Sequence, residues 1–340
     1  MSNLSPKKRL LDTLAKKRVD RPPVICTGGM MNSAIIDVMT KTGHTLPEAH
    51  FEAGRMADLA GGIHSETGFE NIGIPFCMTV EAEVLGSEID FGSLACEPKI
   101  FRELFPSVNS VVFKDINSML GAGRISEVAG AAERLARRYP DQPVIGSLTG
   151  PVSTAASLVD PMQFLKELRK NRENAHRVLE YVSNFLIGFA KVLVDSGATS
   201  ICIGDPTATG EILGPRMFDE YAVSYLNKVI DGIHATGVPV IVHICGEMKA
   251  VKSSIQLLHA DAISTDAFVN LRLLKEEYPQ LTTMGNLSTI LLESGDPGKV
   301  ARRTESLVRE GIDIISPACG LSTSTSLEAI RAMTETVKES

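Results

Sequence analysis

The chain has 340 residues, of which 44% are hydrophobic and 22% are charged, a balance typical of a globular protein with a substantial core. Its formal net charge of −7 argues against a nucleic-acid partner, and no apolar run approaches the length of a membrane span. The six cysteines are irregularly spaced and residues 1–9 lead into no apolar segment, so we expect reduced thiols, no export signal and a cytoplasmic location.

The first third of the chain predicts a helix, a short strand, a second helical segment from about Pro47 to Gly62 and a long irregular segment. The helix begins at Pro6 with Ser5 as its N-cap and forms an N-terminal extension. An apolar strand ends at Cys26, and a glycine pair follows it in a turn. Residues 85–118 are interrupted by prolines, and we interpret them as an excursion beside the main body and not as a separate domain.

Helices and apolar strands alternate regularly from residue 124 to the end of the chain. Strands alternating with helices at this spacing indicate a parallel sheet with helices packed on it. Together with the early strand, seven or eight such units predict an α/β fold, the TIM (β/α)8 barrel, with residues 1–340 as a single domain. The predicted strands lie within residues 143–151, 199–206, 238–246, 261–266, 281–286 and 311–320.

Two of these strands end in residues that bind metals. His243 and Cys245 are two apart, so their side chains project to the same face of a strand. Cys319 follows another apolar strand, and the functional residues of TIM barrels lie at the carboxyl ends of the strands. Two thiolates and one imidazole leave a tetrahedral zinc ion with one open position, as in catalytic zinc sites. The sequence therefore predicts one zinc per chain.

Polar residues also end three other strands. Asp205, Asp266 and Asn286 each follow an apolar run. Asp205 precedes a proline, so capping of the following turn is as reasonable for it as a role in a site. The other four cysteines lie in or near apolar runs, and we interpret them as core residues; they are Cys26, Cys77, Cys96 and Cys202.

The strand-end motifs resemble a known family along essentially the whole chain. They are similar to those of the uroporphyrinogen decarboxylase superfamily of TIM barrels, and most of all to its methylcobamide:coenzyme M methyltransferases. In that family a His-x-Cys pair and a later cysteine hold zinc, which implies the three residues already selected, His243, Cys245 and Cys319. The motifs are Pro22-Pro23-Val24, Ser147-Leu-Thr-Gly-Pro151, Ile203-Gly-Asp-Pro206, Val242-His-Ile-Cys-Gly246, Gly285-Asn286 and Pro317-Ala-Cys-Gly320.

This resemblance implies zinc-dependent methyl transfer from a methylated corrinoid to a thiol, with coenzyme M as the favoured acceptor. The cation would stabilise the acceptor's thiolate. The chain has no Asp-x-His-x-x-Gly motif, so a separate corrinoid protein is expected to present the methylcorrinoid. Asp205 would orient a ligand, Asp266 would take the fourth zinc position or support the site from outside it, and Asn286 would bind substrate or corrinoid.

Other functions stay open on the sequence alone. Uroporphyrinogen decarboxylases carry an arginine-rich segment near the first strand that binds substrate carboxylates, but this chain has no arginine between Arg21 and Arg55. Homocysteine or tetrahydrofolate would be alternative methyl acceptors. A non-catalytic corrinoid-protein binder with structural zinc would need four ligands, and three strong ones appear.

Overall fold

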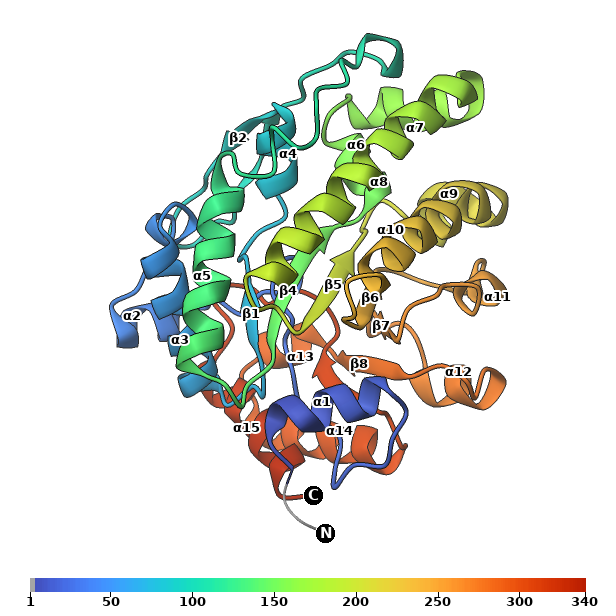
Figure 1. Cartoon of the computed structure of the whole chain (residues 1–340). Coiled ribbons are helices and arrows are strands. Elements are labelled where there is room, and N and C mark those ends of the chain that lie inside the picture. The colour runs from blue at the N-terminus through green and yellow to red at the C-terminus, as the bar shows by residue number, and fades with distance from the viewer. Residues whose placement is uncertain (1–3) are drawn as a thin grey trace.

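The structure is a computed structural model that describes residues 4–340; residues 1–3, part of the segment on which the export prediction depends, lie outside it. Within the described residues, a curled sheet of seven parallel strands occupies the centre, in the order β1-β4-β5-β6-β7-β8-β9 (Figure 1). These are β1 (Ile72–Ile74), β4 (Val144–Thr149), β5 (Ser200–Gly204), β6 (Val240–Ile244), β7 (Ala262–Thr265), β8 (Thr283–Leu287) and β9 (Ile314–Pro317).

Residues 23–26 close the sheet between β9 and β1. On one side the Ile25 N–H donates to the carbonyl of Ile315 at 3.0 Å. On the other side the Asn71 side chain accepts from the Cys26 N–H at 2.9 Å and donates to the Cys26 carbonyl at 2.8 Å. The side-chain amide of Asn71 therefore replaces the backbone hydrogen bonds that would join this segment to β1. With the sheet closed in this way, the predicted TIM barrel is confirmed.

Strand β1 was not predicted, because its middle residue is Gly73, and glycine weakens a strand pattern. The structure shows why glycine stands there. A Cβ atom on Gly73 would lie 2.4 Å from the carbonyl oxygen of Thr27, in the segment that closes the barrel. Close packing of the Thr27 backbone therefore requires glycine at position 73, and this glycine weakens the strand pattern in the sequence.

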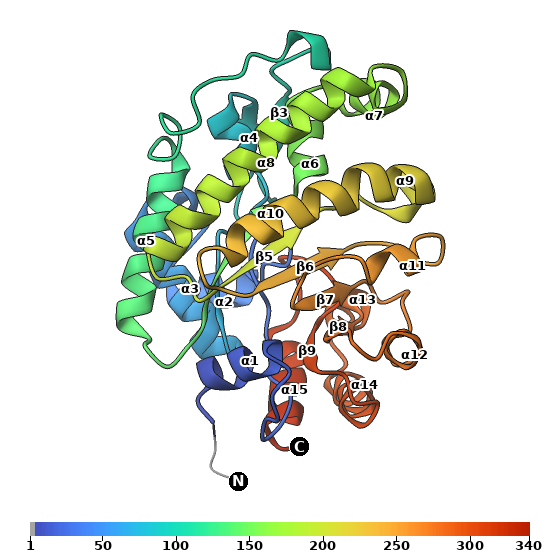
Figure 2. The ribbon, with the colours of Figure 1, turned by 45° about the vertical axis from the view of Figure 1, so that its right-hand side comes forward.

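Helices cover the outside of the barrel (Figures 1 and 2). The long ones bury an apolar stripe against the strands; in α8, for example, Val178, Val182, Phe185 and Phe189 are fully buried. No helix within residues 4–340 is long and apolar enough to cross a membrane. The main outer helices are α3 (Ala53–Thr67), α5 (Arg124–Arg138), α8 (Arg172–Asp195), α10 (Ser224–His234), α12 (Leu271–Glu277), α14 (Pro297–Arg309) and α15 (Leu327–Lys338).

Shorter helices lie in the connections between these elements. They are α2 (Ile36–Thr42), α4 (Val80–Leu85), α6 (Pro151–Ala156), α7 (Pro161–Lys170), α9 (Gly210–Met217), α11 (Lys252–Ile255) and α13 (Thr289–Glu293). The interval 161–196, which reads as one helix in the sequence, is two, because Asn171 leaves the helical conformation with φ −137° and ψ 53°.

The predicted N-terminal extension is confirmed as α1 (Pro6–Leu14), which closes the amino end of the barrel. Ser5 caps it, its hydroxyl accepting from the Lys8 N–H at 3.3 Å. Leu10 and Leu14 pack in one cluster with residues inside the barrel, namely Ile25, Met31, Ile145, Cys202, Ile241, Ala262, Met284 and Ile314. The interior is therefore filled at this end, and the opposite end carries the polar residues.

The predicted excursion is also confirmed. Residues 85–118 contribute no strand to the barrel sheet and form a separate antiparallel pair, β2 (Glu88–Asp90) and β3 (Lys99–Arg102). The Asn32 side chain donates to the Glu97 carboxylate at 2.6 Å. This bond ties the excursion to the turn after the first strand, at the carboxyl end of the barrel.

Candidate metal centre

His243, Cys245 and Cys319 converge at the carboxyl end of the barrel. His243 lies in β6 and is fully buried, Cys245 follows directly after β6, and Cys319 follows β9. The Nε2 atom of His243 is 3.2 Å from the Cys245 sulfur, which is 3.8 Å from the Cys319 sulfur. One ligand atom from each residue lies within 4.8 Å of the others. The structure thus brings together the three residues that the sequence singled out.

Ser264 orients the imidazole of His243. The Nδ1 atom of His243 lies 2.9 Å from the Ser264 hydroxyl, on the neighbouring position of β7 in the strand register. This contact leaves Nε2 directed at the cysteines. Sequence reasoning missed Ser264; the available signal was its place two residues before Asp266, on the same face of a neighbouring strand.

A hydrogen bond joins the two cysteine sulfurs. This side-chain hydrogen bond lowers the pKa of Cys319 to about 4, against the opposing effect of burial. The contact with His243 acts in the same direction. The same Cys245–Cys319 bond, with burial, raises the pKa of Cys245. Of the two thiols, Cys319 is therefore the more acidic.

A methionine, also missed from the sequence as a site residue, borders the cluster. The thioether sulfur of Met30 lies 3.8 Å from the Cys245 sulfur. Met30 belongs to the predicted turn, where the N–H groups of Gly28 and Met31 donate to each other's carbonyls at 3.2 and 2.9 Å. A Cβ atom on Gly320 would lie 2.3 Å from the Met30 carbonyl oxygen, so glycine lets the turn enter the barrel mouth.

Asp205 is fully buried, and its carboxylate holds the start of a neighbouring helix. It accepts from the N–H groups of Val152 and Ser153 at 3.0 and 2.8 Å and from the Ser153 hydroxyl at 2.6 Å. Burial raises the pKa of Asp205 to about 6, against the effect of these hydrogen bonds. Most of its hydrogen-bond partners thus lie at the amino end of α6, which follows the neighbouring strand β4, and a contact with the Ala208 N–H in the turn after Asp205 acts on its pKa in the same direction.

Asp266 begins the loop after β7, and Asn286 lies in the neighbouring strand β8. Asp266 is half-buried, and its charge contributes to raising the pKa of Cys245. Its carboxylate is not among the ligand atoms within 4.8 Å of one another in the described chain. The Asn286 amide donates to the carbonyls of Asp266 and Val269 at 2.8 and 2.7 Å. Asn286 therefore fastens the loop that carries Asp266.

The other cysteines stand apart from the three-residue cluster in the described chain. Cys26 and Cys202 are buried, and burial raises the pKa of each to about 12, as expected for core thiols. Cys77 is buried but has a polar partner, since Arg124 donates to its sulfur at 3.2 Å. Cys96 is exposed on the excursion, so its interpretation as a core residue is wrong.

The chemistry of the three residues fits zinc. Zinc bonds sulfur at about 2.3 Å and imidazole nitrogen at about 2.0 Å, so tetrahedral ligands lie about 3.5 to 3.8 Å apart. The separations of 3.2 and 3.8 Å seen around Cys245 are close to these values. Two sulfurs and one nitrogen would bind the ion and leave one position for a substrate.

Two hollows lie among the loops at the carboxyl end of the barrel. One, of about 360 Å³, lies between the loops after β6 and β7 and includes Met248 and Phe268. The other, of about 310 Å³, lies beyond β4 and β5 and includes Thr149 and Thr207. Neither hollow is lined by His243, Cys245 or Cys319.

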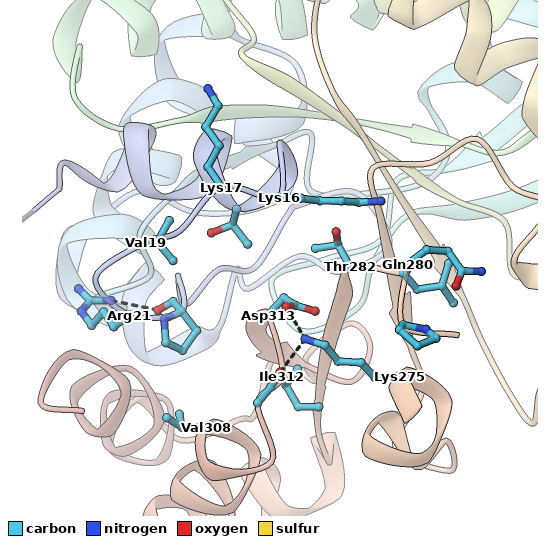
Figure 3. Close-up of a pocket in the computed structure, with 15 residues that line it drawn as sticks. Lys16, Lys17, Val19, Arg21, Lys275, Gln280, Thr282, Val308, Ile312 and Asp313 are labelled. Carbon is cyan, nitrogen blue, oxygen red and sulfur yellow. Dashed lines mark hydrogen bonds and ion pairs between the residues drawn. The ribbon is translucent and has the colours of Figure 1, made fainter. Parts of the chain in front are cut away.

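A further cavity, of about 390 Å³, opens at the opposite end of the barrel (Figure 3). Its lining includes Thr282 and Ile312, which precede β8 and β9. Lys275 and Asp313 also line it and form an ion pair. Because the strands begin here, this cavity lies away from His243 and is not the candidate site.

Comparison with known proteins agrees with these observations. Residues 5–340 match the model of the family described as uroporphyrinogen decarboxylase (URO-D). The chain is 31% identical to the methylcobamide:CoM methyltransferase MtbA of Methanosarcina acetivorans, over 99% of each chain. It is 29% identical to the methylcobamide:CoM methyltransferase MtaA of Methanosarcina barkeri, over 98% of this chain and 97% of the other.

A solved structure shares the whole architecture. A methyltransferase from Methanosarcina mazei superposes with a TM-score of 0.93, at 28% sequence identity and with 99% of each chain covered. The match extends over the barrel, the excursion and the loops that carry the cluster. The chain belongs to the uroporphyrinogen decarboxylase family and, within it, to the group of methylcobamide:coenzyme M methyltransferases.

Proposed function

We propose that this protein transfers a methyl group from a methylated corrinoid to a thiol, with coenzyme M as the favoured acceptor. The observation that carries the proposal is the convergence of His243, Cys245 and Cys319 at the carboxyl end of the barrel. The sequence relationship to methylcobamide:CoM methyltransferases supports the same reaction. Binding of one zinc per chain by these three residues is part of the proposal.

The roles of the side chains follow from their contacts. Zinc, when bound, would supply the positive charge that keeps the acceptor sulfur deprotonated near neutral pH. Cys245 and Cys319 would bind as thiolates, and their electron density keeps that sulfur nucleophilic. Ser264 holds His243 with Nε2 toward the site. The loop fastened by Asn286 keeps the negative charge of Asp266 close by.

The transfer itself is a displacement at carbon. The acceptor loses its thiol proton to solvent when it binds, and its thiolate then attacks the methyl group from the side opposite cobalt. A carbon–sulfur bond forms as the cobalt–carbon bond breaks, and the bonding pair remains on cobalt. The products are a methyl thioether and a Co(I) corrinoid. The protein's part is to hold the sulfur at the barrel mouth and in line with the methyl group.

A separate corrinoid protein is the proposed partner. Large apolar side chains stand exposed on the connections around the same face, among them Phe268 (80% exposed), Ile290 (78%) and Phe101 (71%). They belong to the loop after β7, to α13 after β8 and to the excursion. Exposed apolar groups of this size are typical of interaction sites, and the net charge of −7 favours a partner of opposite charge.

The residues at the carboxyl end of the barrel give little support to the uroporphyrinogen decarboxylase reaction. The segment between Arg21 and Arg55 has no arginine, and the turn at Gly28–Met31 offers Met30 where a carboxylate clamp would need a cation. A structural zinc in a non-catalytic binder would require a permanent fourth ligand, and the described cluster has three residues of the usual ligand types.

The test is a spectroscopic turnover assay. Zinc-loaded protein is mixed anaerobically with methylcobalamin and with coenzyme M, homocysteine or tetrahydrofolate in separate reactions. We expect cobalamin demethylation and a methyl thioether with coenzyme M, and neither with the Cys319→Ala variant. Demethylation with homocysteine alone would identify homocysteine, and not coenzyme M, as the acceptor. Demethylation with tetrahydrofolate alone would contradict transfer to a thiol.

A further inference from the structure

The cavity at the amino end of the barrel is lined by cations, and no step of the proposed methyl transfer uses it. We propose that this cavity, the one drawn in Figure 3, binds an anion that carries two or more phosphate groups. Its volume of about 390 Å³ falls within the range of small-molecule sites, about 300 to 1,000 Å³. The inference goes beyond the proposed function and does not depend on it.

Positive side chains outnumber negative ones in the lining. Four cations line the cavity against one carboxylate, that of Asp313; they are Lys16, Lys17, Arg21 and Lys275. The whole chain has a formal net charge of −7, so this group of cations is opposite in sign to the protein as a whole. A hollow lined by one sign of charge raises the local concentration of the opposite ion, and this one therefore attracts anions.

Two of the four cations are held in fixed ion pairs. Arg21 donates to both oxygens of Glu70, at 2.8 and 2.7 Å. Lys275 pairs with Asp313, whose other oxygen accepts from the N–H and the hydroxyl of Thr283 at 2.8 Å each. These pairs fix the positions of both cations and leave little unbalanced charge on them. The excess charge of the cavity therefore comes from the other two lysines.

Lys16 and Lys17 supply that excess charge. In the described part of the chain the ammonium group of Lys16 forms no ion pair and no hydrogen bond. Lys17 lies 3.6 Å from Asp12, which also accepts from Lys8 at 2.6 Å, so two cations share one carboxylate. In the view of Figure 3 the side chain of Lys16 extends toward Gln280, on the far side of the cavity. An anion in the cavity would give this ammonium group a partner.

Two further donors line the same space. The hydroxyl of Thr282 has no hydrogen-bond partner in the described chain, although the residue is only 7% exposed. Figure 3 shows its oxygen directed toward the side chain of Lys16. The ammonium group of Lys275 has three N–H donors and uses two of them, on Asp313 and on the Gly311 carbonyl at 2.9 Å. A buried donor without a partner is costly, and an anion here would remove that cost.

This donor set favours phosphate over a carboxylate. Carboxylates are best recognised by a free guanidinium fork, and the guanidinium in the lining, that of Arg21, is occupied by Glu70. Lysine binds phosphate through its charge, and a phosphate group carries nearly two negative charges near neutral pH. Unpaired lysines therefore bind phosphate groups more strongly than carboxylates.

The experiment is a calorimetric titration of the full chain with inorganic pyrophosphate. We expect saturable binding by the wild type and about 10-fold weaker binding by Lys16→Gln, because a hydrogen bond from a charged group is lost. Thr282→Val removes the hydroxyl, keeps the shape of the side chain and should also weaken binding. Lys166→Gln is the matched control, since it removes the same charge from an exposed lysine on α7, far from α1 in Figure 1.

Pyrophosphate also binds zinc, so the outcomes must separate the two ends of the barrel. Cys319→Ala, which lacks a proposed zinc ligand, should bind pyrophosphate as the wild type does. Retained binding in Cys319→Ala with weaker binding in Lys16→Gln would locate the anion in the cavity, whether or not the protein transfers methyl groups. Absence of binding by the wild type, or equal affinities of Lys16→Gln and Lys166→Gln, would overturn the inference.

Discussion

The sulfur atoms of Cys245 and Cys319 lie 3.8 Å apart, although 74 positions separate the two residues in the chain. Their strands, β6 and β9, do not pair with each other but meet across the barrel mouth. Only a closed barrel brings them together, so segment 23–26 and its bonds to Ile315 contribute indirectly to the site. Metal binding and barrel closure are therefore expected to stabilise each other.

Removal of a cluster residue should abolish stoichiometric zinc binding. We expect about one zinc per chain in the wild type, and substantially less in His243→Ala and Cys319→Ala, because two ligands cannot hold the ion against exchange with water. Elemental analysis after dialysis measures this. Cys96→Ala is the control, since Cys96 is exposed and outside the cluster. Full occupancy in both cluster variants would refute the ligand assignment.

Ser264→Ala should weaken zinc binding without removing it. The substitution deletes the hydroxyl 2.9 Å from His243 Nδ1 and frees the imidazole to rotate. Loss of such a partner typically costs about 10- to 100-fold in metal affinity. Competition with a chromophoric chelator gives the affinity. Ser200→Ala removes a buried hydroxyl that has no hydrogen-bond partner and should leave affinity unchanged. Equal affinities in the two variants would show that Ser264 does not orient His243.

Asp205→Asn should lower stability and leave zinc stoichiometry unchanged. Its amide group would face the N–H groups of Val152 and Ser153, and an unsatisfied buried donor costs about 1 to 3 kcal/mol. Denaturant unfolding measures the loss, with the exposed Asp195→Asn as control. Loss of zinc from folded Asp205→Asn would instead support the ligand-orienting role that the family resemblance implies.

Glu81 should make stability depend on pH. It is buried, and burial raises its pKa from 4.5 to about 7, against the hydrogen bonds from the N–H and hydroxyl of Thr149. A raised folded-state pKa gives stability that is fully present below pH 4.5 and is lost as pH rises toward 7.

Glu81→Gln provides the measurement. The wild type should lose about 3 kcal/mol relative to this variant between pH 4.5 and 7, at about 1.4 kcal/mol per pKa unit. Unfolding free energies of both proteins across this range give the difference. A difference that stays constant with pH, or that grows in favour of the wild type, would contradict the raised pKa.

The barrel and the three-residue cluster were predictable from the sequence for a common physical reason. Buried parallel strands are continuous apolar runs, and the residue types just after them identify the functional end of a barrel. His243 lies near the end of such a run, and Cys245 and Cys319 follow such runs. Strand β1 was not predictable from local sequence. Its Gly73 is required because the backbone of Thr27, far away in the sequence, packs closely against it.

The roles of the remaining residues depend on which strands are neighbours. Asp205 has the sequence context of a local cap, yet its partners are at the start of α6, about 50 positions earlier. No local motif marks Ser264 or Met30 as a site residue. Their places beside the cluster follow from the strand register for Ser264 and from the turn geometry for Met30. Tertiary contacts of this kind leave no periodic trace in a single sequence.

The central claim is that the cluster activates a thiol by binding it as the thiolate, and proton release tests this most directly. Calorimetric titrations of zinc-loaded protein with coenzyme M are run at pH 7 in two buffers of different ionisation enthalpy. An unbound thiol with a pKa above 8 is mostly protonated at this pH, so we predict release of about one proton per chain. Cys319→Ala should release none. Binding of coenzyme M to the zinc-loaded wild type without proton release would contradict the claim.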